Sequence, residues 1–324
     1  MKSDQKILSI VIPAYNISSY VDECLPTFID KRLFDKVDII LVDDGATDDT
    51  FEKVNKYVKK YPNYFTFVHK DNGGHGSVIN YALHNLIQTK YFKVIDGDDW
   101  TNCDNLVDFV SFLESNDFDL IINDFEMAYP DKSVYKKCYP NNFFGNYKGY
   151  YITIHSITYR TSIFNDHNIL MREKVFYEDN EFVLFPLEFV KKIGYFDKPI
   201  YFYRLGNSDQ SVSYSSMLKR RGDYELIKDD ILNKFISWKL NNVETELLKY
   251  CAYSLSCFYD WLFESAVVLG YDKKEFYSLT NELKKHQEIF QIVKKKRLFK
   301  FIASFNFGFT KLKQKFLKKR LNIK

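Results

Sequence analysis

Short apolar runs alternate with stretches of helical periodicity along the first part of the chain. The runs are rich in β-branched residues, which is typical of strands that are buried on both faces. They cover residues 7–14, 37–42, 65–69, 92–95 and 120–122. Strands that alternate with helices predict a parallel sheet with right-handed crossovers. The sequence therefore predicts an α/β fold in which a mostly parallel, Rossmann-like sheet is flanked by helices.

Polar clusters follow the first four predicted strands, at the point where each strand ends. Asn16 follows the first strand, and residues 43–49, 71–76 and 96–99 follow the next three. Ligands of such sheets bind beyond the carboxyl ends of the strands, so these four segments are expected to meet at one edge. The sequence therefore predicts a single functional site at that edge.

The densest cluster is Asp96-Gly97-Asp98-Asp99, which places three carboxylates at one strand end. Like charges this close raise one another's pKa unless a cation neutralises them. Carboxylate oxygens suit hard divalent ions such as Mg²⁺ or Mn²⁺, and Gly97 allows close approach of the backbone. The alternative is a solvated turn in which Asp99 caps the next helix.

Two other clusters have the chemistry of a nucleotide site. Asp43 or Asp44 could accept a hydrogen bond from a nucleobase N–H, with Gly45 making the turn that follows. The segment 72–76 precedes a predicted helix and could form a backbone nest for phosphate or for a ribose edge, or a plain glycine turn. It has neither a Walker lysine-serine pair nor the pattern G-x-G-x-x-G, which argues against the P-loop and dinucleotide interpretations.

The chain is expected to have three parts. An α/β domain would cover residues 1–215, a helical region 216–293 and a basic tail 294–324. No run of about 18 apolar residues, as a membrane-spanning helix requires, is present, and we expect no signal peptide. The five cysteines are scattered, which argues against a disulfide scaffold or a zinc ribbon and favours a reducing, cytosolic compartment.

The basic tail has the pattern of an amphipathic helix. Residues 294–324 contain twelve Lys or Arg and no Asp or Glu, whereas the rest of the chain is acidic on balance. Apolar residues recur in it at intervals of three and four, from Leu298 to Phe316. Such a helix suits the interface of an anionic bilayer. The alternatives are a solvated helix, or one packed on the acidic body; no signature of RNA binding accompanies it.

Four motifs in order carry a resemblance to a known family. The segments IVIPAYN, VDDGATDDT, DNGGHGSVIN and VIDGDDW resemble those of inverting family 2 glycosyltransferases of the GT-A fold, of the bacterial surface-polysaccharide type. The resemblance covers roughly residues 7–213. It implies a donor site, with Asp43 or Asp44 on the uracil and Asp96 and Asp98 as the D-x-D pair that serves ribose and metal. The other expected donor-site residues are Pro13, Ala14, Tyr15, Asn72, Gly73, Gly74 and Gly97.

Two later motifs extend the resemblance. VFYEDNEF resembles the family's Glu-Asp motif, which implies Asp179 as the catalytic base with Glu178 beside it; the alternative is that the pair simply starts a helix. YFYRLGNSDQSVS resembles the family's Tyr-Arg segment, which implies that Arg204 contacts the diphosphate. Three residues are weaker candidates for the acceptor site, and the first could equally belong to the core: Trp100, Ser211 and Ser213.

The resemblance implies a metal-assisted glycosyltransferase that inverts the anomeric centre. It would use Mn²⁺ or Mg²⁺ and a nucleotide sugar, expected to be UDP-linked, with a glycan or lipid-linked acceptor. Cell-surface polysaccharide or glycoconjugate synthesis at the inner face of the plasma membrane would be its setting. A noncatalytic sugar-nucleotide-binding or membrane-associated scaffold of the same fold is the alternative, and no nucleic acid is expected as partner. The sequence leaves open the donor sugar and the oligomeric state.

Overall fold

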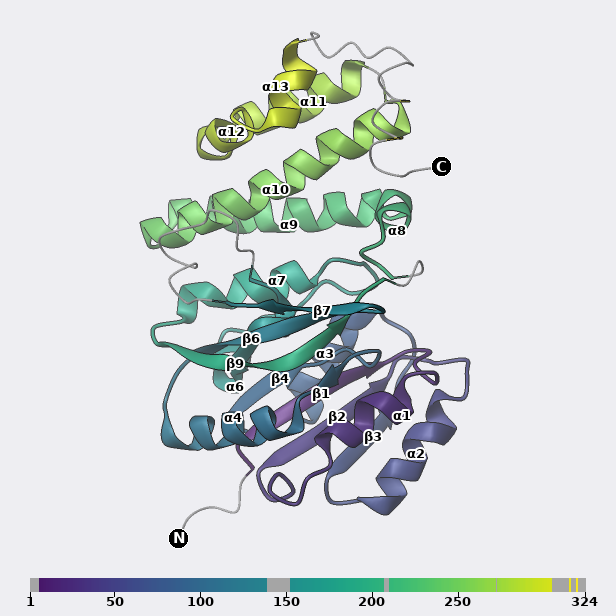
Figure 1. Cartoon of the computed structure of the whole chain (residues 1–324). Helices are drawn as coiled ribbons and strands as arrows, with labels where there is room; N and C mark the ends of the chain where they lie inside the picture. The colour runs from purple at the N-terminus through teal and green to yellow at the C-terminus, as the bar shows by residue number, and fades with distance from the viewer. Residues whose placement is uncertain are drawn as a thin grey trace. The chain divides into compact units, whose positions relative to one another are not determined.

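The computed structural model describes residues 6–138, 152–206, 210–271 and 273–304, together with Lys315 and Lys319. The chain forms two compact units, Met1–Gly206 and Asn207–Lys324. The first unit is built on one curled sheet, and the second is helical (Figure 1). The α/β fold with C-terminal helices that the sequence predicts is thus confirmed. The expected domain boundaries stay predictions.

Four parallel strands form one half of the sheet, in the order β3-β2-β1-β4. They are β1 (Leu8–Ala14), β2 (Val37–Asp43), β3 (Phe65–His69) and β4 (Tyr91–Val94). The register pairs Ala14 with Asp43, and Asp43 with His69. The carboxyl ends of the first three strands therefore lie level, and the loops that follow them begin side by side.

The other half of the sheet is mixed. β8 (Ile157–Arg160) lies antiparallel between β4 and β6 (Leu120–Tyr129), and β6 pairs in parallel with β9 (Ile193–Arg204). Two short strands complete the sheet within the described residues: β5 (Trp100–Thr101) on β9 and β7 (Lys132–Lys136) on β6. The sequence did not predict β8, because its place is set by antiparallel pairing with β4 and β6, which lie far away along the chain.

Helices cover both faces of the sheet. Figure 1 shows α1, α2 and α4 on one face and α3 and α6 on the other. The helices are α1 (Val21–Cys24), α2 (Thr50–Lys60), α3 (His75–Asn85), α4 (Cys103–Ser115), α6 (Thr161–Asp166) and α7 (Asp179–Leu184), with 3₁₀ turns η1 (Leu25–Phe28), η2 (Ile154–Ser156) and η3 (Phe185–Phe189). All the apolar side chains of β1 from Leu8 to Ile12 are fully buried, as a strand covered on both faces requires.

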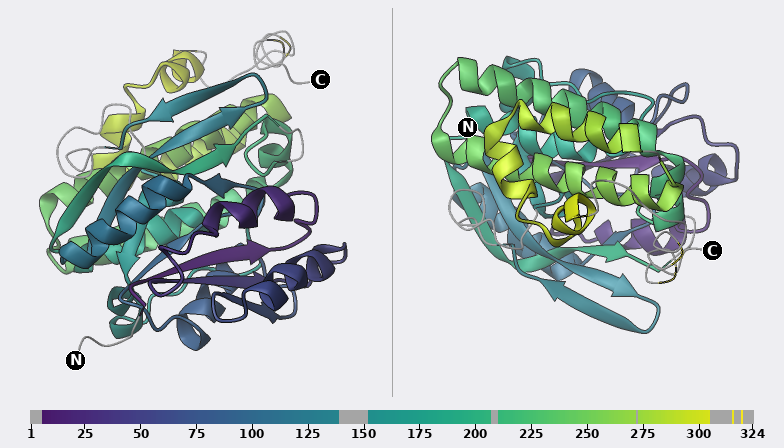
Figure 2. Two further views of the ribbon diagram at one scale, coloured as in Figure 1. Left: turned by 60° about the horizontal axis from the view of Figure 1, so that its bottom comes forward. Right: turned by 90° about the horizontal axis from the view of Figure 1, so that it is seen from above.

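The second unit is a set of helices around an aromatic core. Its long helices α9 and α10 pack against each other (Figure 2). Its elements are α8 (Tyr214–Lys219), α9 (Arg221–Leu240), α10 (Thr245–Leu269), α11 (Lys273–Lys284), α12 (Gln287–Val293) and α13 (Arg297–Ser304). Trp238 and Tyr259 are fully buried, and Glu282 accepts hydrogen bonds from both Lys228 and Tyr259. None of the described helices is long and apolar enough to cross a membrane.

Gly97 sets the position of the acidic turn after β4. A Cβ at this residue would lie 2.7 Å from the carbonyl oxygen of Pro13 and 2.7 Å from Cδ1 of Ile17. Only glycine therefore lets the turn pack directly against the end of β1.

We expect Gly97→Ala to lower the free energy of unfolding by about 1–3 kcal/mol, because the added methyl group overpacks this contact. Gly222→Ala is the matched control, because a Cβ at Gly222 in α9 meets nothing within 4 Å. Urea unfolding of the two variants measures the difference. Equal midpoints for Gly97→Ala and the wild-type protein would contradict the assigned contact.

Candidate functional site

The acidic turn is held by donors from β9. The hydroxyl group of Tyr201 donates to Oδ2 of Asp99 at 2.6 Å and lies 3.1 Å from Oδ2 of Asp96. The backbone N–H of Arg204 donates to Oδ1 of Asp99 at 2.7 Å. Asp99 is buried by these contacts and does not cap α4, which is capped by Asn102. The solvated-turn interpretation is therefore wrong.

The carboxylates of this turn repel one another. Burial and the charge of Asp96 raise the pKa of Asp98 to about 6. Burial and the charges of Asp96 and Asp98 raise the pKa of Asp99 well above its usual value. A bound cation would relieve this repulsion, which is why such a cluster suits a metal ion.

One candidate set of metal ligands lies at this turn, in the part of the chain that the structure describes. Ligand atoms of Asp96, Asp99 and His155 lie within 4.8 Å of one another. Two carboxylates and an imidazole could hold a divalent ion such as Mn²⁺. The set includes Asp99 rather than the predicted Asp98. His155 comes from η2, far along the chain, so no local spacing could have pointed to it.

The expected base lies at the first turn of α7. Burial and the charge of Glu178 raise the pKa of Asp179 to about 7. The side-chain amide of Asn180 donates to Oδ1 of Asp179 at 3.0 Å. Tyr177, just before the pair, has φ of +75°, a conformation that is costly for a residue with a side chain and that often marks functional segments.

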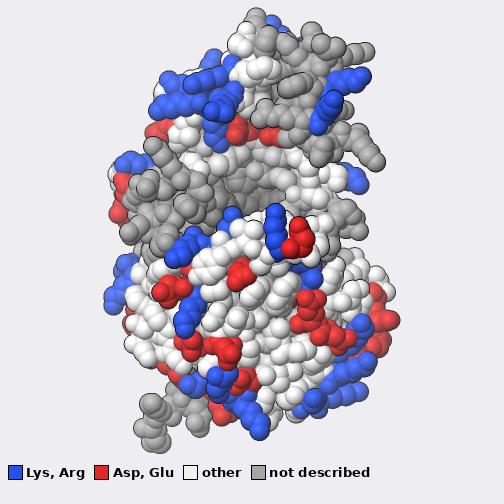
Figure 3. All heavy atoms as spheres, viewed as in Figure 1, with Lys and Arg blue, Asp and Glu red and all other residues white. Residues whose placement is uncertain are grey.

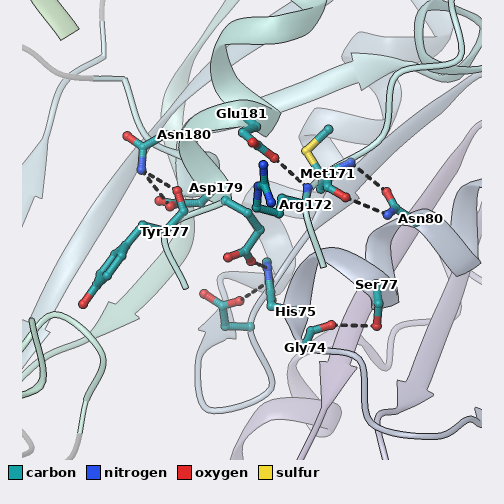
Figure 4. A network of polar contacts seen from close by, with 12 residues as sticks. Gly74, His75, Ser77, Asn80, Met171, Arg172, Tyr177, Asp179, Asn180 and Glu181 are labelled. Atoms are coloured by element: carbon teal, nitrogen blue, oxygen red, sulfur yellow. Dashed lines mark hydrogen bonds and ion pairs between the residues drawn. The ribbon is translucent and has the colours of Figure 1, made fainter. Parts of the chain in front are cut away.

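His75 links the acidic turn to the base segment. Its Nδ1 lies 2.7 Å from Oε1 of Glu178, and its Nε2 lies 3.2 Å from Oδ1 of Asp96. Figure 4 shows the ring of His75 between two carboxylates, with a dashed line to each. Sequence reasoning gave His75 no role, because only the fold brings its partners together.

Asp44 lies in a network of donors between the loops after β2 and β3. Its Oδ1 accepts from Nζ of Lys70 at 2.5 Å and from the N–H of Gly73 at 2.9 Å, and its Oδ2 accepts from the N–H of Gly74 at 2.8 Å. The side chain of Asn72 donates to the carbonyl oxygen of Asp44. The carboxylate expected on the uracil therefore joins two loops in this structure.

The end of β1 and the loop after β2 also meet. Oδ1 of Asp43 accepts from the N–H of Ala46, and its Oδ2 lies 2.8 Å from Nδ1 of His69. Asn16 accepts from the N–H of Thr47 through its side chain. Pro13 and Ala14 end β1, and the ring of Tyr15 beside them is half exposed. The four polar clusters thus do converge on one edge, as predicted.

Arg204 is enclosed by aromatic rings and acidic groups. Its guanidinium group lies 4.6 Å from the centroid of Trp100 and 5.1 Å from that of Tyr20. It donates to the carbonyl oxygen of Asp98 and pairs with Glu23. Trp100 also stacks on Phe202 of β9.

The two serines expected near the acceptor lie in the second unit. Ser211 precedes α8, and Ser213 caps α8 by accepting from the N–H of Ser216. Their expected role stays a prediction.

The fold and the site define the class of the protein. It is an α/β protein whose polar groups gather beyond the carboxyl ends of the parallel strands. The model of glycosyl transferase family 2 matches residues 9–179, more than half of the chain. The chain therefore belongs to this family, and the resemblance seen in its sequence is confirmed.

The proteins with similar sequences include proteins of teichoic acid synthesis. TarS of Staphylococcus aureus, a poly(ribitol-phosphate) beta-N-acetylglucosaminyltransferase, is 26% identical over 235 residues, which are 69% of this chain and 40% of TarS. The minor teichoic acid biosynthesis protein GgaB of Bacillus subtilis is 28% identical over 37% of this chain and 14% of GgaB. The uncharacterized glycosyltransferase MG060 of Mycoplasma genitalium is 32% identical over 36% of this chain and 41% of MG060. The chain spans less than half the length of each of these three relatives.

Solved structures share the fold. TarS 1–349 of S. aureus in complex with UDP-GlcNAc has a TM-score of 0.57 at 20% identity, over 84% of this chain and 89% of that one. The mannosyltransferase PcManGT of Pyrobaculum calidifontis in complex with GDP-Man and Mn²⁺ has a TM-score of 0.56 at 12% identity, over 93% of this chain and 87% of that one. The GT-A fold expected from the sequence is thus confirmed.

We expect Asp44→Asn to lower the free energy of unfolding by about 1–3 kcal/mol in the absence of nucleotide, because it removes a buried acceptor of charge-assisted hydrogen bonds. Asp71→Asn, at an exposed residue of the same loop, is the control. Thermal and urea unfolding measure the change. Equal stability of the two variants would show that Asp44 does not hold the loops together.

Proposed function

We propose that this chain is an inverting glycosyltransferase that moves a sugar from a nucleotide donor, UDP-linked, to a glycan or lipid-linked acceptor of the cell surface. Membership of glycosyl transferase family 2 supports the reaction class. The named relatives in teichoic acid synthesis support the acceptor class. The TarS structure with UDP-GlcNAc supports the choice of nucleotide.

One observation carries the proposal: the acidic turn at Asp96 lies close to the pair formed by Glu178 and Asp179. The turn at Asp96 is crowded with carboxylates that suit a cation. Asp179, the base candidate, lies next to Glu178, which His75 joins to Asp96. A single displacement needs two parts. One is a cation, held by carboxylates, that stabilises the departing diphosphate; the other is a separate carboxylate that takes the proton of the attacking hydroxyl.

Asp179 would take the proton of the acceptor hydroxyl. As the hydroxyl oxygen attacks the anomeric carbon, the bond to the nucleotide diphosphate breaks on the opposite side, and the configuration inverts. The raised pKa of Asp179 makes its carboxylate a stronger base than an ordinary aspartate. Asn180 donates to that carboxylate and orients it.

The metal ligands would come from the acidic turn. Asp96, Asp99 and His155 lie close enough together to hold a divalent ion, and Asp98 is the further carboxylate that the D-x-D pattern offers. A divalent ion bound there would stabilise the charge that develops on the diphosphate. Arg204, beside Asp98, would stabilise the same charge from the protein side.

We expect Asp179→Asn to lower kcat for transfer by about 10²- to 10⁴-fold, because the amide cannot accept the proton of the hydroxyl. UDP affinity should change by less than about threefold, because Asp179 is not expected to contact the nucleotide. UDP release from a panel of UDP-sugars and GDP-mannose, with and without Mn²⁺, measures the first quantity, and a UDP titration measures the second. Asp166→Asn, at an exposed residue, is the control.

Two outcomes would count against the assignment. A loss of UDP binding in Asp179→Asn that matches its loss of turnover would remove Asp179 as the base. A wild-type protein that binds UDP and Mn²⁺ but transfers no sugar, with teichoic acid and lipid-linked acceptors supplied, would favour the scaffold of the same fold.

The pH profile tests the same carboxylate. The base must be ionised to act, and burial and Glu178 raise the pKa of Asp179 to about 7. We therefore expect kcat/KM to rise about tenfold per pH unit below that value and to level off above it. A profile that is flat from pH 5 to pH 8 would contradict this role.

The tail is proposed to bring the enzyme to an anionic membrane surface. Lys and Arg gather where Figure 1 draws α12 and α13 (Figure 3). Phe299 and Ile302 of α13 are buried in the second unit, whereas Phe301 is 42% exposed. The start of the tail therefore packs on the second unit. The apolar residues of the tail's stripe beyond Ser304 lie outside the described residues.

We expect deletion of residues 305–324 to release the protein from vesicles that contain anionic lipid, since each basic residue near such a surface contributes about 1 kcal/mol. Co-sedimentation with anionic and with zwitterionic vesicles measures this, and circular dichroism checks that the helices remain. A variant with the basic residues from Lys311 to Arg320 changed to Gln separates the effect of charge from that of length. Unchanged binding of the truncated protein to anionic vesicles would contradict the proposal.

A further inference from the structure

His75 is the first residue of α3 and directly follows Gly73 and Gly74 in the loop after β3. Its side chain is 27% exposed, whereas that of its partner Glu178 is 4% exposed. The two ring nitrogens point to carboxylates from different parts of the chain, Asp96 after β4 and Glu178 before α7. The ring thus joins the two acidic groups of the site.

The segment before α7 is fitted closely to α3. The side-chain amide of Asn80 donates to the carbonyl oxygen of Met171 and accepts from its N–H, each at 2.9 Å. A Cβ at Gly76 would lie 2.4 Å from the carbonyl oxygen of Arg172 and 3.0 Å from Cγ of Glu178. The surface of α3 therefore supports the segment that carries Glu178, and His75 contacts Glu178 itself.

Without an imidazole, this contact would be unfavourable. Glu178, Asp179 and Asp96 would face one another with like charges and no donor between them. The ring of His75 lies between these groups, with Nδ1 2.7 Å from Oε1 of Glu178 and Nε2 3.2 Å from Oδ1 of Asp96. A ring nitrogen that carries a proton donates to the carboxylate it faces, so the imidazole can hold Glu178 in place.

We propose that His75 is a positioning residue that holds Glu178, and with it the neighbouring Asp179, at a fixed distance from Asp96. The inference rests on the proposed function, in which Asp179 is the base. A shift of the base by about 1 Å can cost about 10²-fold in rate, so the bond from His75 to Glu178 should affect turnover more than binding.

Three variants test the proposal on the full-length chain. We expect His75→Ala to lower kcat by about 10- to 100-fold while KM for the donor changes by less than about threefold. His84→Ala, at an exposed residue of the same helix, should leave both quantities unchanged. His75→Asn, whose amide nitrogen lies near the place of Nδ1 and can donate to Glu178, should recover about tenfold of the lost kcat.

The outcomes separate this inference from the proposed function. A wild-type protein that turns over no donor would count against the proposed function. An active wild-type protein with His75→Ala equal to it in kcat would overturn the inference alone, and so would an Asn variant no better than Ala. A rise in KM as large as the fall in kcat, with a lowered melting temperature, would assign His75 a purely structural role. That result would also overturn the inference.

A spectroscopic measurement covers the case in which a variant does not fold. In the wild-type protein with ¹⁵N-labelled histidine, we expect one strongly deshielded ring N–H that Glu178→Ala removes and Glu173→Ala does not. Absence of that resonance in the wild-type protein at neutral pH would overturn the bridge.

Discussion

The candidate site of the first unit depends on one constraint: carboxylates that repel one another are held close together. The acidic turn at Asp96, Asp98 and Asp99 and the pair at Glu178 and Asp179 meet at the ring of His75. Nothing in the apolar core favours that concentration of charge, and the raised pKa values of Asp98 and Asp179 show its cost. A bound cation would relieve this repulsion, so the cluster is suited to a ligand that brings a cation.

The donors around these carboxylates come from elements far apart in the sequence. Tyr201 and the backbone of Arg204 approach the acidic turn from β9, and His75 approaches it from α3. Glycines make the approach possible, because Gly97 lets the turn contact β1 and Gly76 lets the base segment contact α3. The fold therefore fixes where each of these charges lies, as electrostatic preorganisation requires.

The parallel half of the fold was predictable because its signal is local. Continuous apolar runs gave β1 to β4, and the level ends of those strands brought the polar clusters together as expected. β8 was missed because it is placed by pairing with distant strands. The confirmed family follows from four motifs in order, a longer-range pattern that composition does not contain.

The site was predictable in its location and less so in its contacts. Asp96 and Asp179 were found as candidates, whereas His75 and His155 were not, since their partners lie far away along the chain. Asp43 or Asp44 was expected to contact the uracil of the nucleotide. The buried carboxylate of Asp44 instead joins two loops through Lys70 and backbone N–H groups. Whether a side chain faces a ligand or a neighbouring loop depends on the fold, and the motif alone does not contain that information.

A crystal structure with UDP and Mn²⁺ tests the central claim most directly. The account predicts anomalous density for manganese at the turn formed by Asp96 to Asp99, with the diphosphate beside it and the carboxylate of Asp179 facing the space left for the sugar. UDP bound at another edge of the sheet, or manganese bound away from this turn, would contradict it.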